Sequence, residues 1–204
     1  LKLILDLKSQ PLANSYHKKS ESLEKFPLGL NLCKKCYHLQ LSHIVSPDLL
    51  FKNYLYISGT SKTLRDFFDW FAELCVERSP VQNGRVLDIA CNDGSQLNSF
   101  KNLSWETYGI DPAENLYNIS SKNHNIECGY FNNSSFDSTT FDVITAQNVF
   151  AHNENAIDFL KDCEVKMNDE SLLFIQTSQS EMIRNNQFDT IYHEHLSFLL
   201  IEQI

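Results

Sequence analysis

The stretch "VLDIACNDGSQL" at residues 86–97 reads as a buried strand followed by a turn that opens a helix. The dinucleotide-binding fingerprint G-x-G-x-x-G would need glycines at positions 90, 92 and 95 of such a turn. This chain has Ala90, Asn92 and Ser95 there. The loop therefore argues against a conventional NAD site.

The same loop fits the pattern D/E-x-G-x-G-x-G of class I methyltransferases, aligned on Asp88, Ala90, Asn92 and Gly94, with glycine only at the last position. Gly94 allows the backbone to turn sharply and to approach a ligand. The acidic Asp88 is suited to organise the loop or to contact the amino end of S-adenosylmethionine. That ligand has no pyrophosphate and needs no triple-glycine cradle, so it fits the loop better than NAD does.

A second carboxylate follows the next predicted strand, where "YGIDP" contains Asp111 before Pro112. A carboxylate at a strand end can accept hydrogen bonds from both hydroxyls of a ribose. Together, the loop and Asp111 predict a nucleoside site more specifically than either does alone. The alternative is that Asp88 is only a turn residue and Asp111 only a helix cap.

Outward from this loop, short apolar runs alternate with helical patterns. Four runs read as strands buried in a parallel sheet: "RVLDIA" (85–90), "TYGI" (107–110), "FDVITAQ" (141–147) and "SLLFIQ" (171–176). A helical pattern, "NENAIDFLKDCEVKM", lies between the last two. The alternation predicts an α/β fold with a doubly wound, Rossmann-like sheet, whose ligands sit at the carboxyl ends of the strands.

The chain before residue 85 divides into two further parts. Residues 1–57 mix short apolar runs with Lys, Pro and a cysteine pair, without a sustained helical period, which predicts a small loop-rich module. From Ser61 onward, apolar residues three and four apart form one stripe of an amphipathic helix, which "SPVQNG" ends. We therefore predict a module at 1–57, a linking helix and loop at 58–84, and a larger domain at 85–204.

Composition limits the classes of protein and partner. The 204 residues are 42% hydrophobic, 12% aromatic and 21% charged, which is typical of a globular protein. The formal net charge of −9 argues against a nucleic-acid partner, since such binding needs clustered Lys and Arg. No apolar run approaches the ~20 residues that span a bilayer, and "LKLILDL" is too short and too charged for a signal-peptide core. We expect a cytoplasmic protein without a membrane partner, whose six cysteines are reduced thiols or metal ligands.

Seven segments, taken in order, resemble the S-adenosylmethionine-dependent C-methyltransferases that act on nucleotide-linked 4-keto-deoxysugars. They are "QPLANSY" (10–16), "FPLGLNLCKKCYHLQL" (26–41), "LFKNYLYISGTS" (50–61), "VLDIACNDG" (86–94), "GIDP" (109–112), "NVFAHNEN" (148–155) and "FDTIYHEHLSF" (188–198). The resemblance covers nearly the whole chain. It implies a zinc-binding N-terminal module, a class I methyltransferase domain, a further C-terminal domain and a nucleotide-diphosphate sugar as substrate. Measured against that family, we expect the chain, which begins at Leu1 and stops at Ile204 inside an apolar stretch, to lack the first zinc cysteine pair and most of the C-terminal domain.

The cysteine pair Cys33 and Cys36 has the spacing of half a structural zinc site, because two thiolates three positions apart can bind one tetrahedral ion. The resemblance places the other two cysteines upstream of Leu1. Within the chain, His38, His43 or His17 would complete the site only by accident. We expect zinc in the full-length protein; the alternative is two free thiols in a loop.

Methylation of carbon requires a carbon nucleophile, so a proton beside the sugar's ketone must be removed and the enolate stabilised. By resemblance, Tyr192, Glu194 and His195 match the family's catalytic motif. His195 is the leading candidate for the base, since the ordinary pKa of histidine lies near neutral pH. Glu194 is the candidate for orienting His195 or a substrate hydroxyl, and Tyr192 for hydrogen bonding to the enolate oxygen.

His152 matches a second active-site histidine of the family, and Tyr54 and Tyr56 include its substrate-facing tyrosine, for which we favour Tyr56. The alternatives are a capping or surface histidine and tyrosines that only pack. The resemblance also gives the cofactor-binding set, which is Asp88, Ala90, Asn92, Asp93, Gly94, Asp111 and Asn148.

One departure from the family pattern and three alternatives complete the interpretation. Ala90 replaces the usual glycine, and a methyl group where backbone and ligand approach would weaken binding of S-adenosylmethionine. The first two alternatives are a methyltransferase that acts on oxygen or nitrogen and a non-catalytic zinc and α/β binding module. The third is that His193 and His195, two positions apart, bind a metal from one side of a strand.

Overall fold

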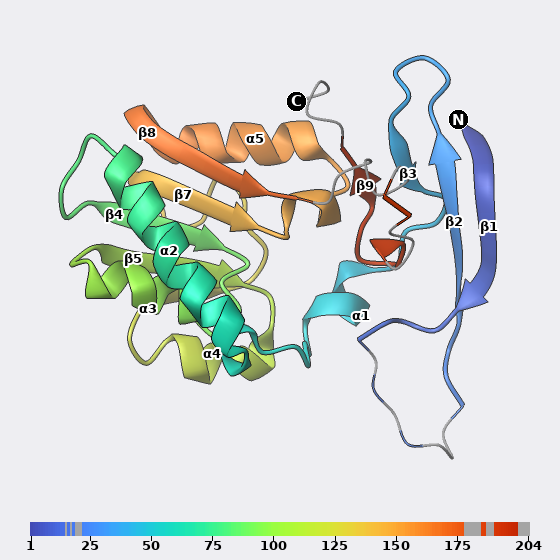
Figure 1. The fold of residues 1–204 in the computed structure, drawn as a ribbon, viewed down its shortest axis with the longest axis horizontal. Helices are drawn as coiled ribbons and strands as arrows, with labels where there is room; N and C mark the ends of the chain where they lie inside the picture. The colour runs from blue at the N-terminus through green and yellow to red at the C-terminus, as the bar shows by residue number, and fades with distance from the viewer. Residues whose placement is uncertain (15, 17, 19–21, 178–184, 187–189, 200–204) are drawn as a thin grey trace.

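The computed structural model describes residues 1–14, 16, 18, 22–177, 185–186 and 190–199. His17, Phe188, Asp189 and residues 200–204 lie outside this described part of the chain. A parallel sheet occupies one half of the molecule, in the strand order β6-β5-β4-β7-β8 (Figure 1). Its strands are β4 (Arg85–Ile89), β5 (Glu106–Asp111), β6 (Asn125–Cys128), β7 (Phe141–Gln147) and β8 (Met167–Gln176).

Helices cover both faces of this sheet. Alternate residues of each strand face opposite sides, so Val86 and Val143 pack with one set of helices while Leu87 and Ile144 pack with another. The first core contains residues of α2 and α3, and the second contains residues of α5. The helices are α2 (Lys62–Arg78), α3 (Ser95–Asn102), α4 (Glu114–Ser120) and α5 (Ala156–Val165).

The predicted doubly wound sheet is confirmed. The chain runs outward from β4 to β5 and β6, then returns to β7 beside β4 and runs outward again to β8. The strand order therefore switches between β4 and β7, which is where such sheets bind ligands. The predicted amphipathic helix is α2, and the side chain of Ser61 caps it by accepting a hydrogen bond from the backbone amide of Leu64.

Two strand predictions need correction. The sequence did not indicate β6 because it is short, carries Asn125 and Glu127, and pairs only with β5. Strand β8 begins at Met167 and not at Ser171, because its polar first residues lie at the exposed end of the strand. The polar stretch 132–140 is a loop with turns.

The N-terminal module is built on antiparallel strands, β1 (Lys2–Gln10), β2 (Phe26–Leu32) and β3 (Leu39–Leu41). A fourth strand, β9 (Ser197–Phe198), comes from the far end of the chain and pairs with β3. Leu28, Leu30, Leu39 and Leu41 form a buried cluster there with Phe198. The module therefore includes residues from the end of the predicted 85–204 domain.

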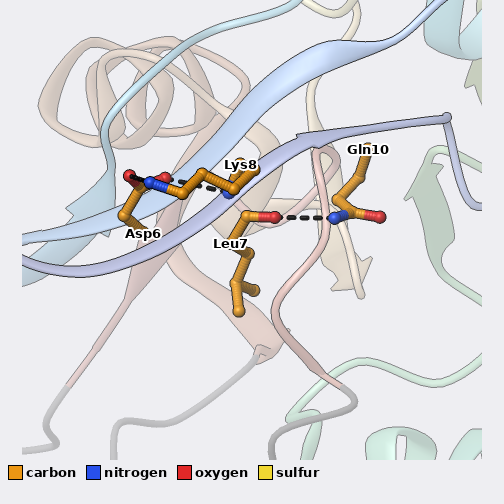
Figure 2. A network of polar contacts seen from close by, with 4 residues as sticks. All are labelled: Asp6, Leu7, Lys8 and Gln10. Carbon is orange, nitrogen blue, oxygen red and sulfur yellow. Dashed lines mark hydrogen bonds and ion pairs between the residues drawn. The ribbon is translucent and has the colours of Figure 1, made fainter.

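Strand β1 is the irregular edge of this sheet. Its pairing with β2 shifts register between Asp6 and Ser9, and Lys8 adopts a φ of 62° there. The Asp6 carboxylate accepts hydrogen bonds from the Lys8 backbone amide at 2.8 Å and from its ammonium group at 2.6 Å, and Gln10 donates to the Leu7 carbonyl at 2.6 Å (Figure 2). A bulge and a charged pair on an edge strand oppose its pairing with another chain.

The connection between the two halves runs through α1 (Pro47–Phe51) and the short helix η1 (Ser58–Thr60) into α2 (Figure 1). A second short helix, η2 (Phe150–His152), follows β7. Within the described ranges, no helix has the length and apolar content needed to cross a bilayer.

Candidate active site

A cavity of about 950 Å³ opens at the carboxyl edge of the parallel sheet. Its walls come from both halves of the molecule. Asp88, Ala90, Asn92 and Asp111 contribute from the ends of β4 and β5, and Asn148 follows β7. The N-terminal part contributes Asn14, Phe51, Tyr54 and Tyr56, and His152, Tyr192 and His195 complete the wall. The fold thus brings together most of the side chains that the sequence suggested.

The loop between β4 and α3 has the backbone conformation that its glycine pattern predicts. Ala90, Asn92 and Gly94 have φ values of 62°, 52° and 80°. Glycine adopts this left-handed region freely and asparagine tolerates it, whereas alanine is disfavoured there by roughly 1–2 kcal/mol. The chain therefore keeps the loop geometry of the D/E-x-G-x-G-x-G pattern although two of its three glycines are replaced.

At Gly94, substitution by any other residue would strain the loop. It precedes the first residue of α3, and a Cβ atom at this position would lie 3.0 Å from Cδ2 of His124. That histidine is itself fixed, because its two ring nitrogens contact Thr107 and Asn98 at 2.8 and 3.2 Å. Both the positive φ and the close approach therefore require glycine.

Asp88 and Asp111 occupy the two positions predicted for a nucleoside ligand. Asp88 is 3% exposed and accepts a hydrogen bond from the Thr145 hydroxyl at 2.7 Å; burial raises the pKa of its carboxyl to about 7. Asp111 accepts hydrogen bonds from the backbone amides of Asn92 and Ala113, each at 2.8 Å, and burial raises its pKa. The bond to Ala113 sets the start of α4, so Asp111 both supports local structure and lines the cavity.

His195 and Tyr192 form a hydrogen-bonded pair in the wall of the cavity. Nδ1 of His195 lies 3.0 Å from the carbonyl oxygen of Thr190, which only accepts, so this nitrogen carries the proton. Nε2 then accepts from the Tyr192 hydroxyl, 3.0 Å away. Burial lowers the pKa of His195 and raises that of Tyr192, so both groups are neutral near pH 7.

His152 is the second imidazole of this wall. Its ring packs against those of Phe51 and His195, with centroid distances of 5.5 and 5.2 Å, and it is stacked nearly parallel to the Phe51 ring. Burial, together with the neighbouring His195, lowers the pKa of His152 to about 3. Its Nε2 atom is buried without a hydrogen-bond partner, so it is available to a hydrogen-bonding group of a bound molecule.

The carboxylate of Glu194 does not contact His195, and Glu194 is not among the residues that line the cavity. It is 3% exposed and accepts hydrogen bonds from the Asn14 amide at 2.6 Å and from the Tyr54 hydroxyl at 3.0 Å. Burial raises the pKa of Glu194, and these two donors oppose the rise. The expected orientation of His195 thus comes from Thr190 and Tyr192, while Glu194 holds a tyrosine of the wall.

Tyr54 and Tyr56 both line the cavity but differ in their surroundings. The Tyr54 ring is half-buried, its hydroxyl is fixed on Glu194, and burial raises its pKa. Tyr56 is 48% exposed and packs edge-on against Tyr54 at a centroid distance of 6.4 Å. The more strongly positioned phenol is therefore that of Tyr54.

Sequence reasoning missed several residues of the site. Asn14, Phe51 and Ser58 line the cavity, and Thr145 and Thr190 hold Asp88 and His195. Asn14 and Thr145 have no spacing rule that relates them to the residues they meet, because they reach the site from distant parts of the chain. Ser58 and Thr190 lie inside the quoted segments, but their residue types alone did not indicate a role. The glycine in "YISGTS" was one available signal of a close backbone approach, which the structure shows at Gly59.

Cys33 and Cys36 lie in the turn between β2 and β3. The backbone amides of Cys36 and Lys35, and the Cys36 side chain, bond to the Cys33 sulfur and lower the pKa of its thiol to about 7. Such stabilised thiolates suit zinc, which needs four ligands. Over the described ranges, no group of three or more His, Cys, Asp or Glu residues is placed to hold a metal, and zinc binding by this pair stays a prediction.

The alternative metal pair, His193 and His195, is not formed. Residues 192–194 lie in a turn and not in a strand. The Nε2 atom of His193 contacts the Phe26 carbonyl at 3.2 Å, whereas His195 faces Tyr192 and the cavity. The two rings face different parts of the protein because the chain turns between them.

Comparison with protein families identifies the class. A family model described as "Methyltransferase domain" matches residues 60–204, and one described as "Putative zinc binding domain" matches residues 1–51. The chain belongs to this methyltransferase family and has the class I S-adenosylmethionine-dependent methyltransferase fold.

Two curated relatives are similar in sequence. The C-methyltransferase NovU of Streptomyces niveus is 28% identical over 181 residues, which cover 85% of this chain and 43% of the relative. An uncharacterized methyltransferase of Staphylococcus carnosus is 27% identical over 146 residues, 70% of each protein. The chain thus spans less than half the length of NovU.

Solved structures share the fold. The plantazolicin methyltransferase BpumL, in complex with a pentazolic desmethylPZN analog and SAH, superposes with a TM-score of 0.59 at 22% identity, over 71% of this chain and 62% of that one. An S-adenosylmethionine-dependent methyltransferase from Clostridium acetobutylicum gives a TM-score of 0.51 at 14% identity, over 63% and 55%. At these identities the likeness concerns the fold.

Proposed function

We propose that this protein transfers a methyl group from S-adenosylmethionine to a ring carbon of a nucleotide-linked 4-keto-deoxysugar by way of an enolate. The observation that carries the proposal is that two neutral imidazoles and a phenol lie together in the wall of a cavity that Asp88 and Asp111 also line. The similarity to a C-methyltransferase over 85% of the chain supports it. The family match supports zinc in the N-terminal module, with Cys33 and Cys36 among its ligands.

The residues at the carboxyl ends of β4 and β5 fit the cofactor. Asp111 has the position to accept hydrogen bonds from ribose hydroxyls, and Asp88 offers a buried carboxylate to a cationic group. Ala90, Asn92 and Asn148 would complete this end, since all three line the cavity. Asp93 and Gly94 are not among the lining residues and would contribute through the geometry of the loop. S-adenosylmethionine supplies an electrophilic methyl group on a sulfonium centre.

The remaining residues perform proton transfer. His152 offers a buried Nε2 without a partner, and His195 offers a second acceptor once Tyr192 releases it. Freed from His195, the Tyr192 hydroxyl is able to donate a hydrogen bond to the oxygen on which negative charge develops. Removal of the carbon-bound proton and stabilisation of the enolate therefore have separate groups on the same wall.

The charge of the cavity bears on how the substrate lies. Among the described residues that line it, carboxylates are present but Lys and Arg are not. The sugar ring would accordingly face the histidines and tyrosines, and the diphosphate would lie outside these walls, since it requires cationic or amide partners.

The test is exchange of a carbon-bound hydrogen. Incubated in heavy water with a 4-keto nucleotide sugar, the full-length enzyme should replace the hydrogen beside the ketone with deuterium. His152→Asn and His195→Asn should each slow exchange by about 10²–10⁴-fold, which is the usual contribution of general-base catalysis. Affinity for S-adenosylmethionine, measured by calorimetry, should remain. His43→Asn, a change at an exposed histidine remote from the cavity, is the matched control.

Three outcomes would contradict the proposal or replace it. Methyl transfer without exchange, and without loss in either variant, would indicate methylation of oxygen or nitrogen instead. Exchange that persists in both variants would remove the two histidines from proton transfer. A protein that S-adenosylmethionine does not stabilise would be a binding module, since a ligand at a hundred times its Kd adds about 2.7 kcal/mol to stability.

A further inference from the structure

The side chain of Asn92 joins the cofactor loop to the linker that precedes α2. Its Nδ2 donates to the Tyr56 carbonyl at 3.0 Å, and its Oδ1 accepts from the Ser58 backbone amide at 3.0 Å. The Asn92 backbone amide meanwhile donates to Asp111 at 2.8 Å. One residue of the cofactor loop is therefore bonded to the nucleoside carboxylate and to the segment that carries the tyrosines.

Asp93 repeats this contact one residue further on. Its Oδ2 accepts from the Gly59 backbone amide at 3.1 Å, while its Oδ1 accepts from the Ser95 amide at the start of α3, also at 3.1 Å. A Cβ atom on Gly59 would lie 2.2 Å from the Ser95 hydroxyl and 2.5 Å from Asp93 Oδ2. Only glycine lets the linker approach the loop this closely.

The conformation of Asn92 shows what its side chain contributes. With a φ of 52°, position 92 would suit glycine better than any other residue. Asparagine adopts this conformation less readily than glycine. Its side-chain amide, however, accepts a hydrogen bond from the Ser58 amide and donates one to the Tyr56 carbonyl. The loop thus gains a connection that the glycine of the usual pattern lacks.

We propose that Asn92 and Asp93 are positioning residues, which fasten the segment 56–59 to the cofactor loop and thereby hold Tyr54 and Tyr56 at the cavity wall. Tyr54 is fixed from the other side by hydrogen bonds between its backbone and the Asn115 side chain, at 2.9 and 3.0 Å. The role in turnover rests on the proposed function. The fastening itself concerns backbone contacts that are measurable without substrate.

The experiment removes the connection from each side. Asn92→Gly deletes both side-chain hydrogen bonds while keeping the backbone amide that binds Asp111. Gly59→Ala pushes the linker away and leaves the sequence of the cofactor loop unaltered. Asn83→Gly, the same substitution at an exposed asparagine with a φ of 54°, controls for the relief of backbone strain. Thermal melts verify that each variant is folded.

Two readouts are expected to move together. The backbone amides of Ser58 and Gly59 should exchange with solvent faster in Asn92→Gly and Gly59→Ala than in Asn83→Gly. The kcat/KM for deuterium exchange into the ketosugar should fall by up to about 10²-fold, as displacement of positioned groups does. In Gly59→Ala the Kd for S-adenosylmethionine should change less than about threefold, well under a tenfold step of 1.4 kcal/mol. A residue with a merely structural role would lower stability without this separation of substrate from cofactor effects.

The outcomes separate the two proposals. If the wild-type enzyme neither exchanges nor methylates the sugar, the proposed function is wrong, and the amide exchange still tests the fastening. If the wild type is active but both variants keep its amide protection and its kcat/KM, the positioning role is overturned. A loss of S-adenosylmethionine affinity in Gly59→Ala that matches the loss of turnover would assign the segment to cofactor binding and also overturn it.

Discussion

Asp88 and Asp111 are the same residue type on neighbouring parallel strands, yet their surroundings differ. Asp111 accepts two backbone hydrogen bonds, which oppose the effect of burial on its pKa. Asp88 has one hydroxyl donor, Thr145, and lies deeper, so burial dominates and raises the pKa to about 7. Part of the Asp88 population is therefore protonated at neutral pH when no cation is bound.

This difference predicts a pH-dependent stability. The native pKa of Asp88 lies above the usual value of 3.8 for an aspartate, so the native state binds the extra proton between pH ~4 and ~7. The free energy of unfolding therefore falls as the pH rises through this window, by up to about 4 kcal/mol. Asp88→Asn, which still accepts from Thr145, should remove this fall.

Urea unfolding of the ligand-free protein at pH 5 and pH 8 measures the effect. The free energy of unfolding of Asp88→Asn minus that of wild type should be larger at pH 8 than at pH 5. The exposed Asp169→Asn in β8 serves as the control and should keep the wild-type slope. Equal slopes for Asp88→Asn and wild type would show that the carboxyl is ionised throughout this range.

At the scale of elements, the turn that carries Tyr192 and His195 is held between the two halves of the molecule. The Leu196 amide donates to the Ala151 carbonyl of η2 at 2.8 Å, and the Leu196 carbonyl accepts from the Leu41 amide of β3 at 2.9 Å. Strand β9 then pairs with β3 and buries Phe198 completely. The position of this turn therefore depends on this short strand.

Phe198→Ala should consequently destabilise the protein by about 3–5 kcal/mol, the usual result of deleting a buried phenylalanine ring. Its ring also packs edge-on against His195 at a centroid distance of 6.2 Å, so exchange activity should fall as well. Phe198→Leu, which keeps most of the volume, should cost less than about 1.5 kcal/mol. Denaturant unfolding measures both; a loss below 1 kcal/mol for alanine would show that β9 contributes little.

At the scale of the whole molecule, both halves contribute to the walls of the cavity. The parallel sheet supplies the carboxylates of the cofactor end, while the N-terminal part supplies Asn14, Phe51 and Tyr54. In the module, Asn14 lies after β1 and Phe51 ends α1, and the cysteine turn lies between β2 and β3. Order in the module should therefore affect the substrate end of the cavity more than the cofactor end.

This arrangement predicts the effect of zinc removal. Elemental analysis of the full-length protein should find about one zinc ion per chain, which Cys33→Ser or Cys36→Ser removes. Exchange into the ketosugar should then fall by up to about 10²-fold through displacement of the wall, with S-adenosylmethionine affinity within about threefold. The exposed Cys128→Ser is the matched control and should keep its zinc. Absence of zinc from wild type purified without chelators would make Cys33 and Cys36 ordinary thiols.

The local sequence pattern was sufficient to predict much of the fold. The apolar runs around Val86 and Val143 specify buried parallel strands because no other element hides a short run on both faces. The loop at 90–94 shows its conformation through the glycine pattern, since positive φ restricts residue choice. The motif around His195 indicated acid and base chemistry from residue types alone.

Only the tertiary structure decided which groups meet. Asn14 and Glu194 are far apart in sequence but share a hydrogen bond of 2.6 Å, and β9 joins a sheet whose other strands lie near the N-terminus. The partner of Glu194 and the unpartnered Nε2 of His152 have no local signature. Periodicity and propensity describe the chain within a few turns, whereas these contacts arise when two separately specified sheets pack around one cavity.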